Sequence, residues 1–201
     1  MAERLAGGNV ALALLCNAIA TGAALTVLIL TFGPLSGAHF NPWVSAFAAI
    51  RGDLAAREAG LYAAAQVVGA VVGVVFANLM FDLPAVQISA TLRDGGGRLL
   101  GEVVATLGLL VLIFGGGQRD RAMLPYAVGL YITAAYWFTS STSFANPAVT
   151  LARSLSATFA GIAPQSVPAF LLAQLLGGAI AIAVVKVVFD EPTADQPSAR
   201  R

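Results

Sequence analysis

Five stretches of this sequence are apolar and long enough to cross a lipid bilayer as helices, namely residues 9–32, 59–81, 99–115, 122–139 and 167–189. A bilayer core about 30 Å thick requires about 20 mostly apolar residues in helical form. Charged residues make up 10% of the chain, against roughly 25% in an ordinary soluble domain, and 58% of the residues are hydrophobic. The sequence therefore predicts an all-α membrane protein with several spans.

Two shorter stretches, residues 41–50 and 146–155, have a different character. Each is about ten residues long, half of what a span needs, and each begins with Asn-Pro. Asn is a favoured N-cap, and Pro suits the first helical position because its missing N–H would have no partner there. Irregular backbone at membrane depth is tolerated where it lines a wet cavity or is buried in protein. We therefore expect two half-helices that enter the membrane and turn back.

The two halves of the chain share a common spacing. Asn146 follows Asn41 by 105 residues, Gln66 follows Asn41 by 25, and Gln174 follows Asn146 by 28. Each Gln is followed three positions later by Gly, and Gly73 extends the first of these into a small-residue face suited to close helix packing. A half-helix in each half of a membrane protein indicates a transport site at the interface of an inverted repeat. We divide the chain into a first half-repeat, a connecting loop, a second half-repeat and a polar tail, at residues 1–82, 83–98, 99–190 and 191–201.

The halves are unequal, because two spans precede Asn146 within the second half, whereas one precedes Asn41 within the first. A counterpart of the span at 99–115 would lie upstream of Met1. Two readings stay open: the true start lies upstream of Met1, or the chain is a shortened form.

Positive charge predicts the orientation. With a cytoplasmic carboxyl terminus, the inside holds seven Lys and Arg residues and the outside holds four. The inner set is Arg51, Arg57, Arg119, Arg121, Lys186, Arg200 and Arg201, and the outer set is Arg4, Arg93, Arg98 and Arg153. We therefore expect a multi-pass protein with its amino terminus outside.

The run SGAHFNP at residues 36–42 resembles the first signature of the aquaporin, or major intrinsic protein, family, and Asn146-Pro147-Ala148 matches the second. The resemblance implies that the half-helices meet at mid-membrane with both Asn side chains facing one narrow pore. It also implies five of the family's six spanning helices, the first being absent, in a homotetramer of the bacterial inner membrane. It implies no cofactor and no metal. The expected pore constriction consists of Asn41, Pro42, Trp43, Asn146, Pro147 and Ala148.

Elementary electrostatics agree with this interpretation. Each half-helix amino terminus carries about half a positive charge from its aligned peptide dipoles, so two such ends facing one lumen repel cations and hydronium. The Asn amides offer N–H donors, while apolar walls offer nothing to an ion that leaves water. A small neutral solute exchanges its hydrogen bonds nearly evenly. The alternative is that each Asn-Pro is an ordinary turn.

The family's selectivity filter is carried over by offset from the two Asn residues. The four positions are Thr21, Ala134, Ser143 and Val149. The family usually has Arg where this chain has Val149, so the resemblance implies a wider, uncharged opening. Together with the run NPAVTLARS at 146–154, this is similar to the bacterial branch associated with arsenic resistance, which is thought to pass arsenite or methylated arsenicals. Arg153 lies about one helical turn past Val149, so we do not expect it to replace the missing Arg.

Three other residues each leave two interpretations. Trp43 replaces the Ala that usually ends the first signature, and its indole either narrows the lumen or packs between helices. His39 matches the family's signature His and is either structural or a gate or ligand. Glu102 is a carboxylate early in a span. Either it accepts backbone N–H bonds from the second half-helix loop, as in the family, or it extends to the membrane interface.

The leading hypothesis is a passive channel for small neutral solutes, water and glycerol-like polyols among them. The second is a non-conducting membrane scaffold with the same fold, favoured by Trp43 and the short start. A secondary transporter is third, and Glu102 is the one acid available to couple an ion. One His, one Cys and no paired buried carboxylates give no support to an enzyme. A net charge of +1 with no basic run gives none to a nucleic-acid partner.

Overall fold

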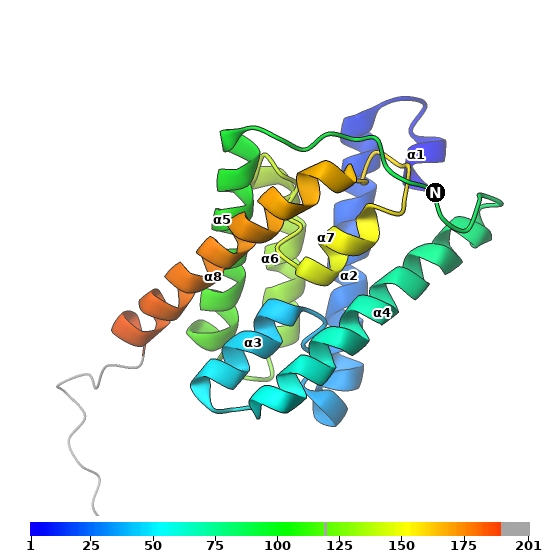
Figure 1. The fold of residues 1–201 in the computed structure, drawn as a ribbon. Helices are drawn as coiled ribbons and strands as arrows, with labels where there is room; N and C mark the ends of the chain where they lie inside the picture. The colour runs from blue at the N-terminus through cyan, green and yellow to red at the C-terminus, as the bar shows by residue number, and fades with distance from the viewer. Residues whose placement is uncertain (119, 190–201) are drawn as a thin grey trace, which may run out of the picture.

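Helices account for nearly all of the regular structure in the computed structural model, which describes residues 1–118 and 120–189 (Figure 1). The α-helices are α1 Ala2–Leu5, α2 Val10–Ser36, α3 Pro42–Arg51, α4 Ala56–Met80, α5 Gly96–Phe114, α6 Leu124–Phe138, α7 Pro147–Arg153 and α8 Val167–Val188. Two short 3-10 turns, η1 Gly116–Gln118 and η2 Pro164–Ser166, precede α6 and α8. Within the described residues no strand occurs, which confirms the all-α prediction. The expected polar tail, 191–201, lies outside the described residues.

Four of the described helices are long and apolar enough to cross a membrane: α2, α4, α5 and the run Pro164–Val188 that contains α8. The fifth expected span, 122–139, forms α6, which has 15 residues. At 1.5 Å per residue it is about 22 Å long, shorter than a bilayer core. It is therefore not among the four candidates, although it forms where a span was expected. The helix ends where Thr139 turns to extended backbone and begins a run of Ser and Thr, residues that compete with helical hydrogen bonds.

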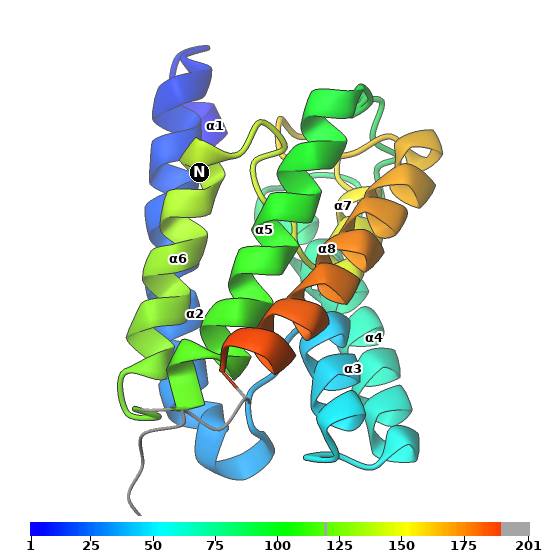
Figure 2. The ribbon, with the colours of Figure 1, turned by 90° about the vertical axis from the view of Figure 1, so that its left-hand side faces the viewer.

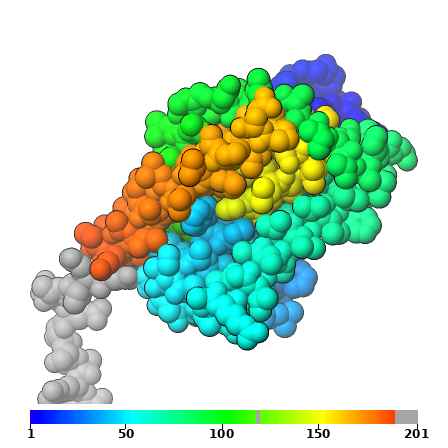
Figure 3. Space-filling model, viewed as in Figure 1, coloured from blue at the N-terminus to red at the C-terminus, as the bar shows by residue number. Residues whose placement is uncertain are grey.

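Both half-helices form where Asn-Pro predicted them. Asn41 is the N-cap of α3, and Gly52, with a left-handed φ of 82°, is its C-cap. Asn146 is the N-cap of α7, which has seven residues and so is shorter than the expected 146–155. The two half-helices lie between α4 and α8 on the side of the bundle that faces the viewer in Figure 1, which is the right-hand side in Figure 2, and parts of both are visible on that surface (Figure 3).

Glycine allows α2 and α6 to pack closely. A Cβ added at Gly22 of α2 would lie 2.6 Å from the backbone oxygen of Gly129, and one added at Gly129 of α6 would lie 2.6 Å from that of Gly22. Thr26 and Thr133, one turn beyond each glycine, cover the other glycine's position. The two helices therefore cross backbone to backbone, as small residues permit in membranes.

The chain also packs α5 against α8, at Gly177, whose added Cβ would lie 3.1 Å from Thr106. The helix α4 is different, because it packs against the half-helices α3 and α7. In the space-filling view α7 lies between α8 and α4 (Figure 3). A Cβ at Gly69 or Gly73 of α4 would meet nothing within 4 Å among the described residues. The expected close packing at these glycines is therefore not seen there.

We call the end of the bundle that carries α1, residues 83–95 and η2 the α1 face. The opposite end, which carries the α3–α4 turn and η1, is the α3 face (Figure 1).

Candidate functional site: a cavity at two opposed half-helices

The two half-helices are joined at their amino termini by reciprocal hydrogen bonds. The side-chain amide of Asn41 donates to the backbone oxygen of Ala145 at 2.7 Å, and that of Asn146 donates to the backbone oxygen of Phe40 at 2.8 Å. Each Asn side-chain oxygen also caps its own helix, accepting from the N–H of Trp43 at 3.0 Å and of Ala148 at 3.0 Å. An amide group has two N–H donors, so each Asn keeps one beyond these bonds.

The two loops that precede the Asn residues share an unusual backbone. The residue before each Asn, Phe40 or Ala145, has a left-handed φ of 48° or 45°. The residue three positions before each Asn also has a left-handed φ, of 46° at Ala38 and 49° at Ser143. Such conformations are uncommon for residues other than glycine and persist where the surroundings enforce them. The reciprocal Asn bonds are one such constraint, because Phe40 and Ala145 are their acceptors.

A buried carboxylate holds the second loop. Glu102 is 0% exposed, and its two oxygens accept from the N–H of Phe144 at 2.8 Å and of Ala145 at 2.9 Å. The amide of Gln174 donates to Glu102 at 2.7 Å and to the hydroxyl of Thr150 at 2.8 Å. Glu102 therefore makes the loop contacts of the first interpretation and does not extend to the interface.

The first half repeats part of this arrangement. The amide of Gln66 donates to the hydroxyl of Ser45 at 3.1 Å, four residues after Asn41, as Thr150 is four residues after Asn146. His39 lies 3.0 Å from the same hydroxyl through its Nδ1 and packs against Tyr62. Burial lowers the pKa of the His39 imidazole, which lies in a loop outside the spanning helices, so it is neutral at pH 7.

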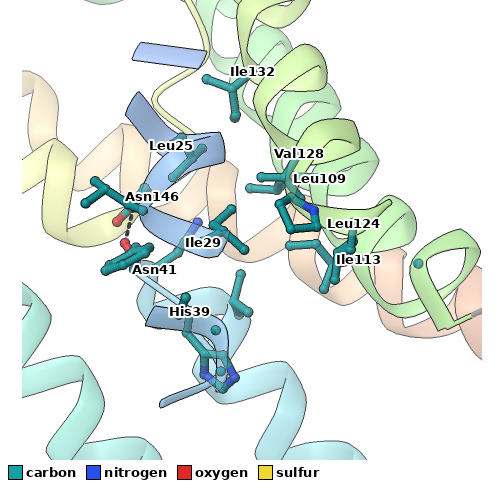
Figure 4. Close-up of a pocket in the computed structure, with 18 of the residues that line it drawn as sticks. Leu25, Ile29, His39, Asn41, Leu109, Ile113, Leu124, Val128, Ile132 and Asn146 are labelled. Atoms are coloured by element: carbon teal, nitrogen blue, oxygen red, sulfur yellow. Dashed lines mark hydrogen bonds between the residues drawn. The ribbon is translucent and has the colours of Figure 1, made fainter. Parts of the chain in front are cut away.

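A cavity of about 800 Å³ runs beside the two Asn residues. Figure 4 shows Asn41 and Asn146 on one side of it, opposite apolar side chains of α5 and α6 such as Leu109 and Val128. Arg153 lines it at the carboxyl end of α7, and Arg121 lines it in the segment between η1 and α6. No Asp or Glu is among its described lining residues. The cavity is thus mainly apolar, with a few polar groups and two positive charges.

Two overlapping parts of the chain, residues 3–140 and 120–200, match the family described as Major intrinsic protein. The chain belongs to the major intrinsic protein family. It is 52% identical over 186 residues to aquaglyceroporin AqpS of Rhizobium meliloti (strain 1021), a match that covers 92% of this chain and 79% of that protein. The sequence-based assignment to an aquaglyceroporin-like branch of the family is thereby confirmed.

More distant relatives agree. The chain is 32% identical over 183 residues to aquaporin NIP1-4 of Oryza sativa subsp. japonica, covering 86% of this chain and 66% of that one. It is 31% identical over 116 residues to the glycerol uptake facilitator protein of Bacillus subtilis (strain 168), covering 51% and 42%. The chain therefore spans less than two thirds of the length of these two relatives.

Within this family member, the residues expected at the pore constriction divide into two groups. Asn41 and Asn146 line the cavity. The other four, Pro42, Trp43, Pro147 and Ala148, are not among its lining residues. Trp43 packs into the cluster around Leu110 and lies 3.6 Å from a Cβ placed on Gly178 of α8. Its indole therefore fills space between helices, because it points about 100° around α3 from Val44, which does line the cavity.

Three of the four residues expected in the selectivity filter line the cavity, and one does not. Thr21, Ser143 and Val149 line the cavity, while Ala134 is exposed and does not. On α6 the cavity is lined instead by Ile132 and Tyr136, two residues before and after it. Successive helical residues are 100° apart, so Ala134 faces nearly the opposite way from both. Counting twelve residues back from Asn146 selects the wrong face of α6, because the count crosses the irregular loop at 139–145.

Tyr136 and Arg153 line the cavity near Thr21 and Val149, and neither was expected to line it. The hydroxyl of Tyr136 lies 3.4 Å from that of Thr21 and accepts from Nη2 of Arg153 at 2.8 Å. Arg153 lines the cavity one turn beyond Val149, so the opening is not uncharged. The spacing of four residues was the available signal, because residues i and i+4 share a helix face.

Proposed function

We propose that this family member is a passive transmembrane channel for small neutral solutes, namely water and glycerol-like polyols. The observation that carries the proposal is the pair of reciprocal bonds between the two half-helix termini beside the cavity. Flux is bidirectional, follows the gradient and needs no cofactor. The names of the aquaglyceroporin and glycerol-facilitator relatives support this substrate class.

Selectivity follows from charge and desolvation. The amino termini of α3 and α7 each place about half a positive charge beside the lumen, which disfavours cations. The apolar wall of α5 and α6 does not replace an ion's hydration shell, whereas a polyol exchanges its hydrogen bonds with the free Asn donors. Thr21, Ser143 and Val149 form the filter in this proposal. The hydroxyl of Ser143 supports it, since it lacks a hydrogen-bond partner among the described residues.

We extend the proposal to arsenite and methylated arsenicals, which are polyhydroxylated and resemble glycerol in shape. The small side chain of Val149, where the family usually has Arg, supports passage of solutes wider than water. We also propose a homotetramer in the bacterial inner membrane with a cytoplasmic carboxyl terminus, on the family resemblance and the charge bias.

A non-conducting scaffold is the second candidate. The observation that favours it is the exposure of α4. In the most apolar 18-residue window of α4, 6% of the residues are buried, whereas the corresponding share for α5 is 39%. The cavity is also bordered by Leu28, Leu30 and Phe40, which are 41%, 44% and 37% exposed. The position of Trp43 outside the cavity removes one ground for this candidate.

Stopped-flow light scattering of proteoliposomes in glycerol and water gradients tests the proposal. Ile132→Trp fills the cavity and should abolish most glycerol flux, while Leu130→Trp, on the same helix but 71% exposed, should leave it unchanged. Glycerol leak no faster than in empty vesicles, with the protein monodisperse, would support the scaffold. Equal flux through both variants would contradict this cavity as the route.

A further inference from the structure

A second cavity of about 230 Å³ lies at the α1 face, beside the first. It is bordered by the start of α2, the segment that leads into α5 and the loop after α7. Its charged lining residues are Arg93, Arg98 and Arg153. No Asp or Glu is among its described lining residues, and none of the three arginines has a described carboxylate within 4.0 Å.

Arg93 is committed to the fold. It is 7% exposed, and its guanidinium donates to the backbone oxygens of Gly161 at 2.7 Å, Ser141 at 3.1 Å and Phe159 at 3.0 Å. These bonds hold the guanidinium in place but do not neutralise its charge. Burial and the positive charges of Arg153 and Arg98 lower the pKa of Arg93 to about 10. Arg153 and Arg98 are therefore each close enough to repel Arg93, and Glu102 is close enough to attract it.

Arg153 keeps donors to spare. Of its five N–H groups, one bonds to Tyr136 through Nη2, while Nη1 is buried and has no partner among the described residues. The guanidinium lies over the ring of Phe144 at 4.3 Å, which holds it at the boundary of the two cavities. An unpaired buried donor is unfavourable and indicates a partner that the protein does not supply.

None of the acids Glu3, Asp94 and Glu102 lines this cavity. Glu102 is bonded to the N–H groups of Phe144 and Ala145. Glu3 accepts from the N–H of Phe159 at 3.1 Å, and Asp94 is exposed. A negative ligand would thus meet positive charge without displacing an existing ion pair.

We propose that this second cavity binds a small oxyanion of phosphate or carboxylate type, with the guanidinium of Arg153 as its main contact and Arg98 and Arg93 as supporting charges. Guanidinium forks suit planar or tetrahedral oxyanions. Because Arg153 and Tyr136 also line the main cavity, the bound oxyanion lies at the mouth of the proposed pore and hinders solute entry there. This binding goes beyond the proposed function and does not require conduction.

Inorganic phosphate is the probe, and its binding is measured first by calorimetry in maltoside micelles, which contain no added phospholipid. Arg153→Met should weaken phosphate binding at least tenfold, and Arg153→Lys should weaken it less because the charge remains. Arg57→Met, an exposed arginine of α4 at the α3 face, is the matched control and should bind like the wild type. Sodium chloride at equal ionic strength separates binding from screening. Phosphate binding that is absent, or equal in Arg153→Met and wild type, would overturn the proposal.

Flux supplies the second readout. In phosphatidylcholine vesicles, phosphate should slow glycerol flux in the wild type and in Arg57→Met, but not in Arg153→Met. A phosphate effect that disappears in vesicles containing phosphatidylglycerol would identify a lipid headgroup as the occupant and overturn a soluble ligand. If phosphate binds but no variant conducts glycerol, the oxyanion site stands and the channel proposal fails.

Discussion

Replacing Glu102 by Gln tests the central support of the second loop. The carboxylate accepts three hydrogen bonds, from the N–H groups of Phe144 and Ala145 and from the amide of Gln174. A Gln in the same place has one oxygen. In the better of its two orientations, the Gln oxygen accepts from the N–H of Ala145 and from the amide of Gln174. Its NH₂ group then faces the N–H of Phe144. The N–H of Phe144 thereby loses its acceptor and meets the two N–H donors of the new NH₂ group, and the remaining bonds lose their charge assistance.

The magnitude follows from these losses. An unsatisfied buried donor costs about 1–3 kcal/mol, and hydrogen bonds to charged groups are roughly twice as strong as neutral ones. We therefore expect Glu102→Gln to reduce the free energy of unfolding by about 2–4 kcal/mol, and to lower glycerol flux because Ala145 holds Asn41. The measurement is unfolding by dodecyl sulfate in maltoside micelles, followed by tryptophan fluorescence.

Thr106 provides the matched control, one turn along α5 and also 0% exposed. Its hydroxyl has no hydrogen-bond partner among the described residues. Thr106→Val removes that polar group at nearly constant shape, so stability should stay level or rise by up to about 1 kcal/mol. If Glu102→Gln unfolds at the same dodecyl sulfate fraction as Thr106→Val, the Glu102 carboxylate does not stabilise the second loop.

Three other changes give separate tests. Val149→Arg should slow glycerol while sparing water in stopped-flow assays, and equal loss of both would show that the filter assignment is wrong. Gly22→Val should destabilise the crossing of α2 and α6 by about 1–3 kcal/mol through overpacking. Gly69→Val should change the unfolding midpoint little, because a Cβ at Gly69 meets no described atom within 4 Å. Burial lowers the pKa of His39, so the unfolded state takes up its proton first and stability should fall as pH drops below about 6.5. The same unfolding assay at pH 7.5 and 5.5 should show that loss in the wild type and less of it in His39→Gln.

The parts of the site that sequence could predict are those set by local chemistry. Asn41 and Asn146 cap their own helices within two or three residues, so their role is visible in the dipeptide Asn-Pro. Glu102 stands out because a carboxylate in an apolar span needs partners. The left-handed backbone at Phe40 and Ala145 is different. Neither residue favours it, and among its constraints is a bond from an Asn more than a hundred positions away.

The misplaced filter position has an equally physical cause. A count of residues predicts which way a side chain points only along a continuous helix. The count of twelve residues from Ala134 to Asn146 crosses seven loop residues. The position of Arg153 required no such crossing, since α7 is helical from Pro147 to Arg153. Counting four residues along one helix is reliable, whereas counting twelve across a loop is not.

The two halves support their loops unequally, and this difference bears on the whole site. Gln174 joins Thr150 to Glu102, but the corresponding Gln66 bonds to Ser45 while its side-chain oxygen is buried without a partner among the described residues. No described carboxylate takes the place of Glu102 in the first half. The first loop therefore depends more on its bonds to the second, through Asn146 to Phe40, than the second depends on the first. Because both Asn side chains border one cavity, the geometry of the first half at the lumen rests on the carboxylate of the second.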